Sequence, residues 1–369
     1  MDVGPILGIL SIPRAHTNSF VGGQSESFTE ILTIAKRMNC TAFVFGPFDI
    51  NWGKRAVWGY RYNSETQPGE WTSQLFPLPT VIYNRIPNRT IENKEAIQCE
   101  MEHLRKIFGP RIFNPYFLDK WNTHSILYNN SLTSSLLPET RRLYKPKTVT
   151  NMLRKYGSVY LKPTANSLGN EMIKIRLVSP DQYYFVHQSL NNPRREGLAP
   201  SFPELLAELP PICDSSEYLI QQAIPLARVG NRPFDLRLLV QKNRRGEWRR
   251  TGLAARVAGE GSISTHVFYG GTRFPAHQAI DEAALRHGFS AKTVTRQLKR
   301  IVSLVPQVIE KSCGRTFGEL EIDLGIDSSG YVWFFEANSK PFKFDEKLIR
   351  AKSIVRLIHY VHYLDALEL

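Results

Sequence analysis

Cysteine is scarce and scattered in this chain. Among 369 residues there are four cysteines, at least 59 positions apart: Cys40, Cys99, Cys213 and Cys313. No CxxC pair and no Cys/His spacing of a zinc site occurs, and nothing indicates a disulfide framework. A reduced interior suits such cysteines, and we expect them to serve as small hydrophobic side chains in the core.

Long apolar runs are absent as well. The longest are the length of a strand, far short of the ~20 residues that cross a bilayer. The opening MDVGPILGILSIP has an acid at position 2, no basic stretch and too short an apolar run for a signal peptide. These features predict a cytoplasmic protein with no membrane span.

Three common site fingerprints are also missing from the sequence. GxxxxGK[ST] and GxGxxG do not occur, so neither a P-loop nor a dinucleotide-binding Rossmann site is supported. The GxSxG motif of serine hydrolases does not occur either.

The composition is that of a globular protein with an uneven charge. Hydrophobic residues make up 42% and charged residues 22%, which excludes a disordered chain, and the length predicts two or three packed units. The net charge is +13; residues 141–256 hold 20 Lys/Arg against 9 Asp/Glu, whereas residues 1–118 hold 12 against 10. Such a field attracts nucleic acid, an anionic surface or a phosphate-bearing small molecule. No stacking aromatic pattern accompanies it, so nucleic acid is not expected.

Two kinds of secondary-structure pattern follow each other along the chain. Up to residue 118, strand-like segments (ILGILSI, TAFVFGPFDI, TVIYNRI) alternate with helical ones (SFTEILTIAKRMN, IENKEAIQCEMEHLRKIF), which predicts an α/β domain with a parallel sheet. The pattern changes around 113–118. From 119 to 369, antiparallel strands mix with helices, which is typical of an α+β fold.

One segment, EIDLGID-SSG-YVWFFEAN, carries paired acids. With Ser328-Ser329 as a two-residue hairpin loop, Asp323 would lie opposite Phe334. Strand alternation then places Asp323, Glu336 and Asn338 on one face. The other face would be the core, formed by Ile322, Leu324, Ile326, Tyr331, Trp333, Phe335 and Ala337. Carboxylate and amide oxygens on rigid strands suit Mg²⁺, and a solvated acidic face suits the pattern equally well.

Basic residues in three further segments are candidates for phosphate contact. In SVYLKPTANSLGNEMIKI a strand ends at Lys162, and a loop containing Gly169 can lay backbone N–H groups over phosphates; a plain hairpin would look the same. In RPFDLRLLVQ, Arg237 shares a face with Asp235, so its partner is either a phosphate or that carboxylate. Arg256 in GLAARVA raises the same question.

In their order along the chain, these segments resemble the ATP-grasp superfamily, and within it the YheC/YheD family of endospore coat-associated proteins. VIYNRIPNR resembles that family's N-terminal signature, and from Asp119 the match runs nearly to the C-terminus. The resemblance implies nucleotide-binding lysines at Lys120 (in DKWNTHSIL) and Lys162. It further implies nucleotide contacts at Gly169 and from LIQQAI, arginines and glycines at a reaction centre, and magnesium ligands on the hairpin. The LIQQAI contacts are Gln221, Gln222, Ala223 and Ile224. The reaction-centre residues are Arg237, Arg256, Gly270 and Gly271. The magnesium ligands are Asp323, Glu336 and Asn338.

The fold implied by the resemblance is an N-terminal α/β pre-ATP-grasp domain (1–118) followed by a two-subdomain ATP-grasp module (119–369). The first subdomain would span about 119–220 and carry the phosphate loop, and the second about 221–369 and carry the metal hairpin.

The implied activity is that of an ATP- and Mg²⁺-dependent carboxylate–amine ligase acting through an acyl phosphate. Its carboxylate and amine substrates are not defined, amino acids and acidic peptides being candidates. Its context would be sporulation, with spore coat proteins as partners and the coat as a second location. The usual pattern is not kept at Glu171, Gln222 and His266, where a glycine, a carboxylate and an asparagine are common. A non-catalytic ATP-binding or structural coat protein is therefore the alternative.

Overall fold

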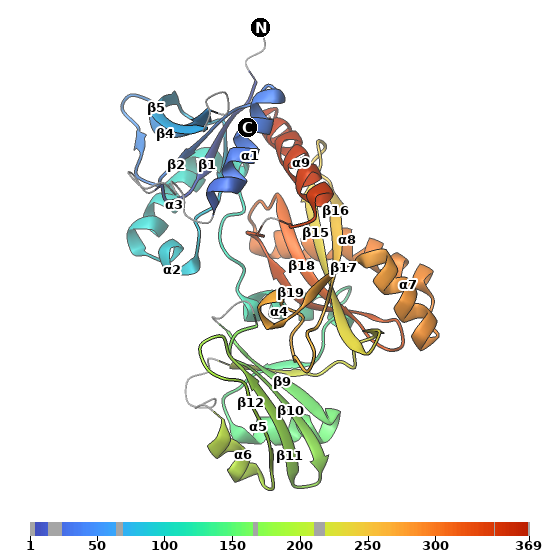
Figure 1. Ribbon diagram of the computed structural model, residues 1–369. Helices are drawn as coiled ribbons and strands as arrows, with labels where there is room; N and C mark the ends of the chain where they lie inside the picture. The colour runs from blue at the N-terminus through green and yellow to red at the C-terminus, as the bar shows by residue number, and fades with distance from the viewer. Residues whose placement is uncertain are drawn as a thin grey trace.

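The computed structural model describes residues 4–13, 24–63, 69–164, 169–209, 218–342 and 344–367. Three β-sheets organise these residues, each with its own helices (Figure 1). Cys213 and the end of the Pro-rich insertion lie outside the described residues. Of the other cysteines, Cys40 is buried as predicted, whereas Cys99 is exposed and Cys313 partly exposed, so the core prediction is wrong for Cys99.

The first sheet has the order β3-β4-β2-β1-β6-β7, with β5 paired to β4. Its centre is parallel, as predicted: β2 (Thr41–Phe45), β1 (Ile6–Leu10), β6 (Val81–Asn84) and β7 (Ile112–Phe113). At one side the chain adds β3 (Ile50–Asn51) and an antiparallel hairpin, β4 (Ala56–Asn63) and β5 (Glu70–Pro77), which the sequence analysis did not identify. We call this sheet with α1 (Ser25–Arg37), α2 (Arg89–Glu92) and α3 (Glu95–Phe108) the N-terminal unit.

The last helix of the chain completes the core of the N-terminal unit. α3 packs on one face of the first sheet, and α1 packs on the other. Beside α1 lies α9 (Lys347–Asp365), whose Ile354, Leu357, Ile358 and Val361 are buried among the α1 and sheet residues (Figure 1). The two ends of the described chain are therefore joined in one hydrophobic core.

The second sheet is antiparallel, with the order β12-β11-β10-β9-β13-β8. Its strands are β8 (Thr140–Arg142), β9 (Ser158–Pro163), β10 (Met172–Ser179), β11 (Gln182–Gln188), β12 (Arg195–Ala199) and β13 (Tyr218–Gln222). The helices α5 (Pro146–Tyr156) and α6 (Phe202–Glu208) share a core with it. In Figure 1 this sheet lies at the end of the molecule far from the N-terminal unit.

The third sheet lies between the other two and has the order β17-β16-β15-β18-β19, with β14 paired to β15. The strands are β14 (Arg228–Val229), β15 (Arg232–Lys242), β16 (Trp248–Val257), β17 (Thr272–Pro275), β18 (Glu319–Ile326) and β19 (Val332–Asn338). One face packs on α4 (Lys120–Tyr128), α7 (Ala276–His287) and the long α8 (Ala291–Cys313).

The β18–β19 hairpin differs from its predicted register in two places. Its loop is longer than two residues: the Asp327 amide donates to the Tyr331 carbonyl at 3.0 Å. This shift turns Val332 and Phe334 into the core, so the predicted core positions Tyr331, Trp333 and Phe335 are wrong. A bulge then adds one residue to β19, because Leu324 pairs with Phe334 but Asp323 pairs with Glu336.

The bulge restores the face predicted for the hairpin acids. Beyond it, Glu336 lies opposite Asp323, and Asn338 lies opposite Glu321. The longer loop and the bulge together shift the register by two residues, so Asp323 lies opposite Glu336 instead of Phe334, and the predicted face is unchanged.

No helix within the described ranges is both long enough and apolar enough to cross a membrane.

Candidate functional site

A cavity of about 500 Å³ is lined by residues of the second and third sheets and by Pro87–Thr90 of the N-terminal unit. Gly169 and Asn170 before β10, the end of β13, and the face of β15, β16, β18 and β19 opposite the α8 core all contribute to its wall. Most of the sequence-predicted site residues meet here: Lys120, Lys162, Gly169, Gln221, Gln222, Ile224, Arg237, Arg256, Asp323, Glu336 and Asn338. Ala223, Gly270 and Gly271, which the structure also describes, are not among the lining residues.

The two lysines enter the cavity from different elements. Lys120 is the first residue of α4, whose N-cap Asp119 accepts a hydrogen bond from the Asn122 amide at 2.8 Å. The Lys120 ammonium lies 3.8 Å from a Glu336 carboxylate oxygen. Lys162 is near the end of β9, where its ammonium donates to Gln221 Oε1 at 2.6 Å.

Lys162 has an unusually acidic ammonium. Burial, and then the positive charge of Lys120, lower its pKa to about 8, against the opposing influence of Glu336, Asp323 and Asp235. Its ammonium also lies 5.4 Å from the centre of the Phe335 ring, the bulge residue of β19. A cation held in this way is a point charge suited to an anionic ligand.

The end of β13 presents amides and backbone to the cavity. The Gln221 side chain donates to Thr140 Oγ1 at 2.9 Å, which fixes its oxygen toward Lys162. Gln222 Oε1 accepts from the Glu139 amide at 3.3 Å. Glu139 in turn binds Lys155, Tyr156 and Arg141, and these contacts hold its pKa at about 2 despite burial.

The two arginines of the third sheet take different partners. Arg256 binds Asp235 with two hydrogen bonds, Nε–Oδ1 at 2.9 Å and Nη2–Oδ2 at 2.5 Å, and also reaches Asp323 Oδ2 at 2.9 Å. Asp235 is thus the partner of Arg256, not of Arg237. Arg237 instead lies 3.2 Å from Glu321 and 3.5 Å from Asp323.

Glu321 is a cavity residue that the sequence reasoning missed. Alternation along β18 places it on the same face as Asp323, so the signal was present in the ELEID segment. Burial, in spite of the opposing charge of Arg237, raises the pKa of Glu321 to about 7. For Asp323, burial alone would raise the pKa, but Arg256 and Arg237 outweigh it, so the pKa lies below its usual value.

Residues 165–168 of the phosphate-loop candidate lie outside the described residues, and Glu171 follows that loop just before β10. This residue has a positive φ of 55°, and its carboxylate binds His187 Nε2 at 2.8 Å and the Ser189 hydroxyl. The carboxylate is therefore directed at β11 and the segment after it. Gly169 has φ of 69°, and a Cβ there would come within 2.8 Å of Ser264, so glycine is required at this close approach.

Gly270 and Gly271 end the turn that begins at His266: the Gly271 amide donates to the His266 carbonyl at 3.2 Å. A Cβ at Gly271 would lie 2.1 Å from the Thr265 carbonyl, which explains the glycine. His266, which lines the cavity, has its pKa lowered to about 4 by burial and by Arg256 and Arg237, so it is neutral at pH 7. Its Nδ1 accepts the Phe268 amide at 3.4 Å.

The hairpin donors suit a hard cation. Asp323 Oδ1 and Glu321 Oε2 are buried oxygens without a hydrogen-bond partner in the structure. Glu336 and Asn338 lie across from them on β19, and carboxylate and amide oxygens are the donors that Mg²⁺ takes. Within the described ranges, no three His, Cys, Asp or Glu side chains are gathered closely enough to hold a metal ion as they stand.

Comparisons with known proteins agree with this arrangement. The profile of the "YheC/D like ATP-grasp" family matches residues 109–364. The endospore coat-associated protein YheD of Bacillus subtilis (strain 168) is 30% identical over 351 residues, which are 92% of this chain and 73% of YheD. The endospore coat-associated protein YheC of the same organism is 21% identical over 336 residues, 91% of this chain and 88% of YheC.

A solved structure shows the same fold. The VanG D-Ala:D-Ser ligase of Enterococcus faecalis superposes with a TM-score of 0.52 at 11% identity, covering 97% of this chain and 99% of that one. The predicted architecture, an α/β unit followed by an ATP-grasp fold, is confirmed. By the extent of the family match and of the likeness to YheD, the chain belongs to the YheC/D-like ATP-grasp family.

Proposed function

We propose that the cavity binds ATP with Mg²⁺ and that the protein is a carboxylate–amine ligase. One observation carries the proposal: Lys162 of the second sheet and the Asp323–Glu336 pair of the third sheet line one cavity in a chain of ATP-grasp family. The cavity therefore offers an ammonium that can bind phosphate on one wall and carboxylates that can bind a metal ion on another. The volume of about 500 Å³ lies in the range of small-molecule sites.

Each set of cavity residues has a distinct part in this proposal. Lys120 and Lys162 hold phosphate oxygens as point charges. Arg237, paired with Glu321 and Asp323, and Arg256, paired with Asp235 and Asp323, would present N–H groups to charge that develops during transfer. Asp323, Glu336 and Asn338 would hold Mg²⁺, which when bound neutralises phosphate charge. Gln221 and Gln222 at the end of β13, with Ile224 just after it, would border the base.

The reaction would run in two steps. A carboxylate oxygen of one substrate bonds to the γ-phosphorus while the bond from that phosphorus to ADP breaks. The nitrogen of the amine substrate, after losing a proton, then bonds to the activated acyl carbon as phosphate leaves. The electrostatic surroundings of Arg237 and Arg256 suit both steps, because negative charge grows on oxygen in each.

A second candidate, a non-catalytic nucleotide-binding or structural protein, is favoured by a different observation. The hairpin acids already have cations beside them: Asp323 is bonded to Arg256, and Glu336 lies 3.8 Å from Lys120. In a scaffold these pairs would be permanent. In a ligase they would rearrange when metal and nucleotide enter.

The names of YheD and YheC suggest where the protein works. Both are named endospore coat-associated proteins, and we propose the same association for this chain, with coat proteins as partners. Immunoblotting of the forespore, coat and cytoplasmic fractions of the source cell during sporulation tests it. Protein confined to vegetative cytoplasm would oppose the coat association.

Turnover separates the ligase from the scaffold. ADP formation should be measured with MgATP and pooled amino acids or acidic peptides as acceptors. A ligase releases ADP faster with one of the pools, and Arg256→Lys abolishes that increase. Native protein that binds MgATP but turns it over with no pool would support the scaffold.

A further inference from the structure

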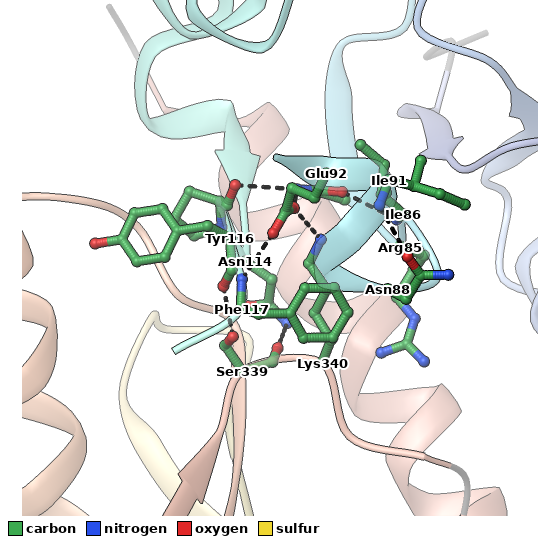
Figure 2. Close-up of polar contacts among 12 residues, drawn as sticks. Arg85, Ile86, Asn88, Ile91, Glu92, Asn114, Tyr116, Phe117, Ser339 and Lys340 are labelled. Carbon is green, nitrogen blue, oxygen red and sulfur yellow. Dashed lines mark hydrogen bonds and ion pairs between the residues drawn. The ribbon is translucent and has the colours of Figure 1, made fainter. Parts of the chain in front are cut away.

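A buried ion pair joins the N-terminal unit to the chain that leaves the β18–β19 hairpin. Glu92 is the last residue of α2, and Lys340 follows Asn338 by two positions. Although they are 248 positions apart, Glu92 Oε1 and Lys340 Nζ are 2.5 Å apart, and each side chain is 2% exposed (Figure 2). A buried charge left without its partner is strongly unfavourable, so the pair holds these two segments together.

Hydrogen-bond donors surround position 92, so the carboxylate is favoured at that position and the ammonium at position 340. Asn84 Nδ2 donates to Glu92 Oε1 at 3.1 Å, and the Phe117 amide donates to Oε2 at 2.9 Å. The Lys340 ammonium lies 4.6 Å from the centre of the Phe117 ring. All the donors around Glu92 therefore point at an anion, and the pair has a fixed direction.

The backbone on either side of Lys340 is held as well. Asn114 Nδ2 donates to the Ser339 carbonyl at 2.7 Å, and the Ser339 hydroxyl donates to the Tyr116 carbonyl at 2.6 Å. Arg85 Nη2 donates to the Pro341 carbonyl at 2.9 Å. Figure 2 shows the Ser339 contacts with Asn114 and Tyr116 beside the Glu92–Lys340 pair. The three residues after the hairpin are thus fastened to the N-terminal unit and to the segment that leads to α4.

The pair also connects two walls of the cavity. Lys340 lines it, and so do Asn88 and Arg89 at the start of α2, the helix that ends in Glu92. We propose that Lys340, held by Glu92, is a positioning residue: it sets where Glu336 and Asn338 lie relative to the wall formed by Pro87–Thr90. The proposal rests on the proposed function only for its second readout, the binding of nucleotide and metal.

The test compares the buried Lys340–Glu92 pair with a partly buried lysine–glutamate pair by the same substitution. Lys340→Met removes the ammonium and keeps most of the chain length. Lys242→Met is the matched control, because Lys242 also pairs with a glutamate, Glu310, at 2.5 Å and also lies by aromatic rings, but does not line the cavity. Glu92→Gln, which keeps the shape of the side chain, serves if Lys340→Met does not fold.

The first readout is amide hydrogen exchange by native full-length protein, which needs no ligand. We expect Lys340→Met to speed exchange in 336–342 and 88–92 at least 10-fold, and Lys242→Met to leave both segments unchanged. The swap Glu92→Lys with Lys340→Glu should not restore protection, since Asn84 and the Phe117 amide would then face an ammonium.

The second readout is the midpoint of Mg²⁺ dependence for ADP binding, measured well below each melting temperature. We expect a shift of at least 10-fold in Lys340→Met, less than 2-fold in Lys242→Met, and recovery in Lys340→Arg. Unchanged exchange in 336–342 overturns the proposal whether or not nucleotide binds. Altered exchange with an unchanged Mg²⁺ midpoint also overturns it, because the pair is then purely structural. Native protein that binds no ADP contradicts the proposed function, and the proposal on Lys340 is then decided by exchange alone.

Discussion

The cavity arginines differ in how firmly each is held. Arg256 is 9% exposed and makes two hydrogen bonds to Asp235 and one to Asp323, whereas Arg237 has two longer ion pairs. Lysine cannot reproduce the planar fork that Arg256 uses. We therefore expect Arg256→Lys to lower the melting temperature more than Arg237→Lys, as measured by differential scanning calorimetry.

Both substitutions should reduce turnover more than stability alone explains. Removing one preorganised electrostatic contact at a reaction centre costs about 10²–10³-fold in rate. The loss in rate is measured as acceptor-stimulated ADP formation, relative to the native protein, at a temperature where each variant is folded. Full turnover by Arg237→Lys would contradict a role for the guanidinium of that residue.

The Lys162 ammonium predicts a pH dependence of nucleotide affinity. It carries its positive charge below its pKa of about 8 and loses that charge as the pH rises through this value. Charged groups facing it come from α4 (Lys120), β15 (Asp235), β18 (Asp323) and β19 (Glu336). We expect ADP affinity to fall between pH 7 and pH 9 in the native protein.

Lys162→Arg isolates this group, because a guanidinium stays charged throughout that range. Isothermal titration at several pH values should show a much flatter profile for Lys162→Arg than for the native chain. Equal slopes in the two proteins would assign the pH dependence to another group.

At the scale of elements, the hairpin turn depends on one carboxylate. Asp327 Oδ1 accepts from the Ser329 amide at 2.8 Å and the Tyr331 amide at 3.0 Å, and Oδ2 accepts from Trp333 Nε1 at 2.8 Å. These donors lower its pKa, although burial alone would raise it. Hydrogen bonds to a charged group contribute about 1.5–3 kcal/mol, so Asp327→Ala should destabilise by roughly that amount at pH 7.

The sign of the pH effect follows from the lowered pKa. The contribution of Asp327 is complete above its unfolded value of 3.8 and is lost as the pH falls through the folded value. Urea unfolding should therefore show a difference between native protein and Asp327→Ala that shrinks below pH 4. A difference that stays constant down to pH 2 would contradict the role of the ionised carboxylate.

The same hairpin shows what sequence patterns reach and where they stop. Alternation within each strand predicts that Asp323 and Glu321 share one face of β18, and that Glu336 and Asn338 share one face of β19. This prediction needs no tertiary information. The register between the strands depends on loop length and on a bulge at Phe335, and neither has a sequence signal as strong as Asn-Gly. The polar residues 328 and 329 suggested a two-residue loop. The observed turn is longer, and the Asp327 carboxylate stabilises it by accepting from the Ser329 and Tyr331 amides.

Contacts between distant elements were out of reach for a different reason. Glu92 and Lys340 each look like an ordinary surface charge in the sequence, and only the packed fold brings them together across 248 positions. The strands β5 and β12 were missed because their residues are mostly polar or exposed. Lys162 and Arg237, by contrast, stand within or beside apolar strands, where a charge is conspicuous.

At the scale of the whole molecule, α9 makes the N-terminal unit dependent on the far end of the chain. Its buried residues Ile354, Leu357, Ile358 and Val361 pack against α1 and the first sheet. Burial of such side chains contributes about 1.5–3 kcal/mol each. We expect a fragment of residues 1–118 to aggregate when produced alone, and to become soluble when residues 341–369 are produced with it.

Fragment solubility and circular dichroism measure that dependence. A folded, monomeric fragment 1–118 would contradict it, and would show that the N-terminal unit has a sufficient core without α9.

The central claim is that the cavity between the second and third sheets binds nucleotide together with Mg²⁺. Isothermal titration of ATP into native protein, with and without Mg²⁺, tests it most directly, with Lys242→Met as a folded control and Asp323→Asn combined with Glu336→Gln as the metal-site variant. We expect Mg²⁺ to strengthen ATP binding in the native protein and the control, and to leave ATP binding by the double variant unchanged. Native protein that gives no binding heat and no rise in melting temperature at saturating MgATP would contradict it.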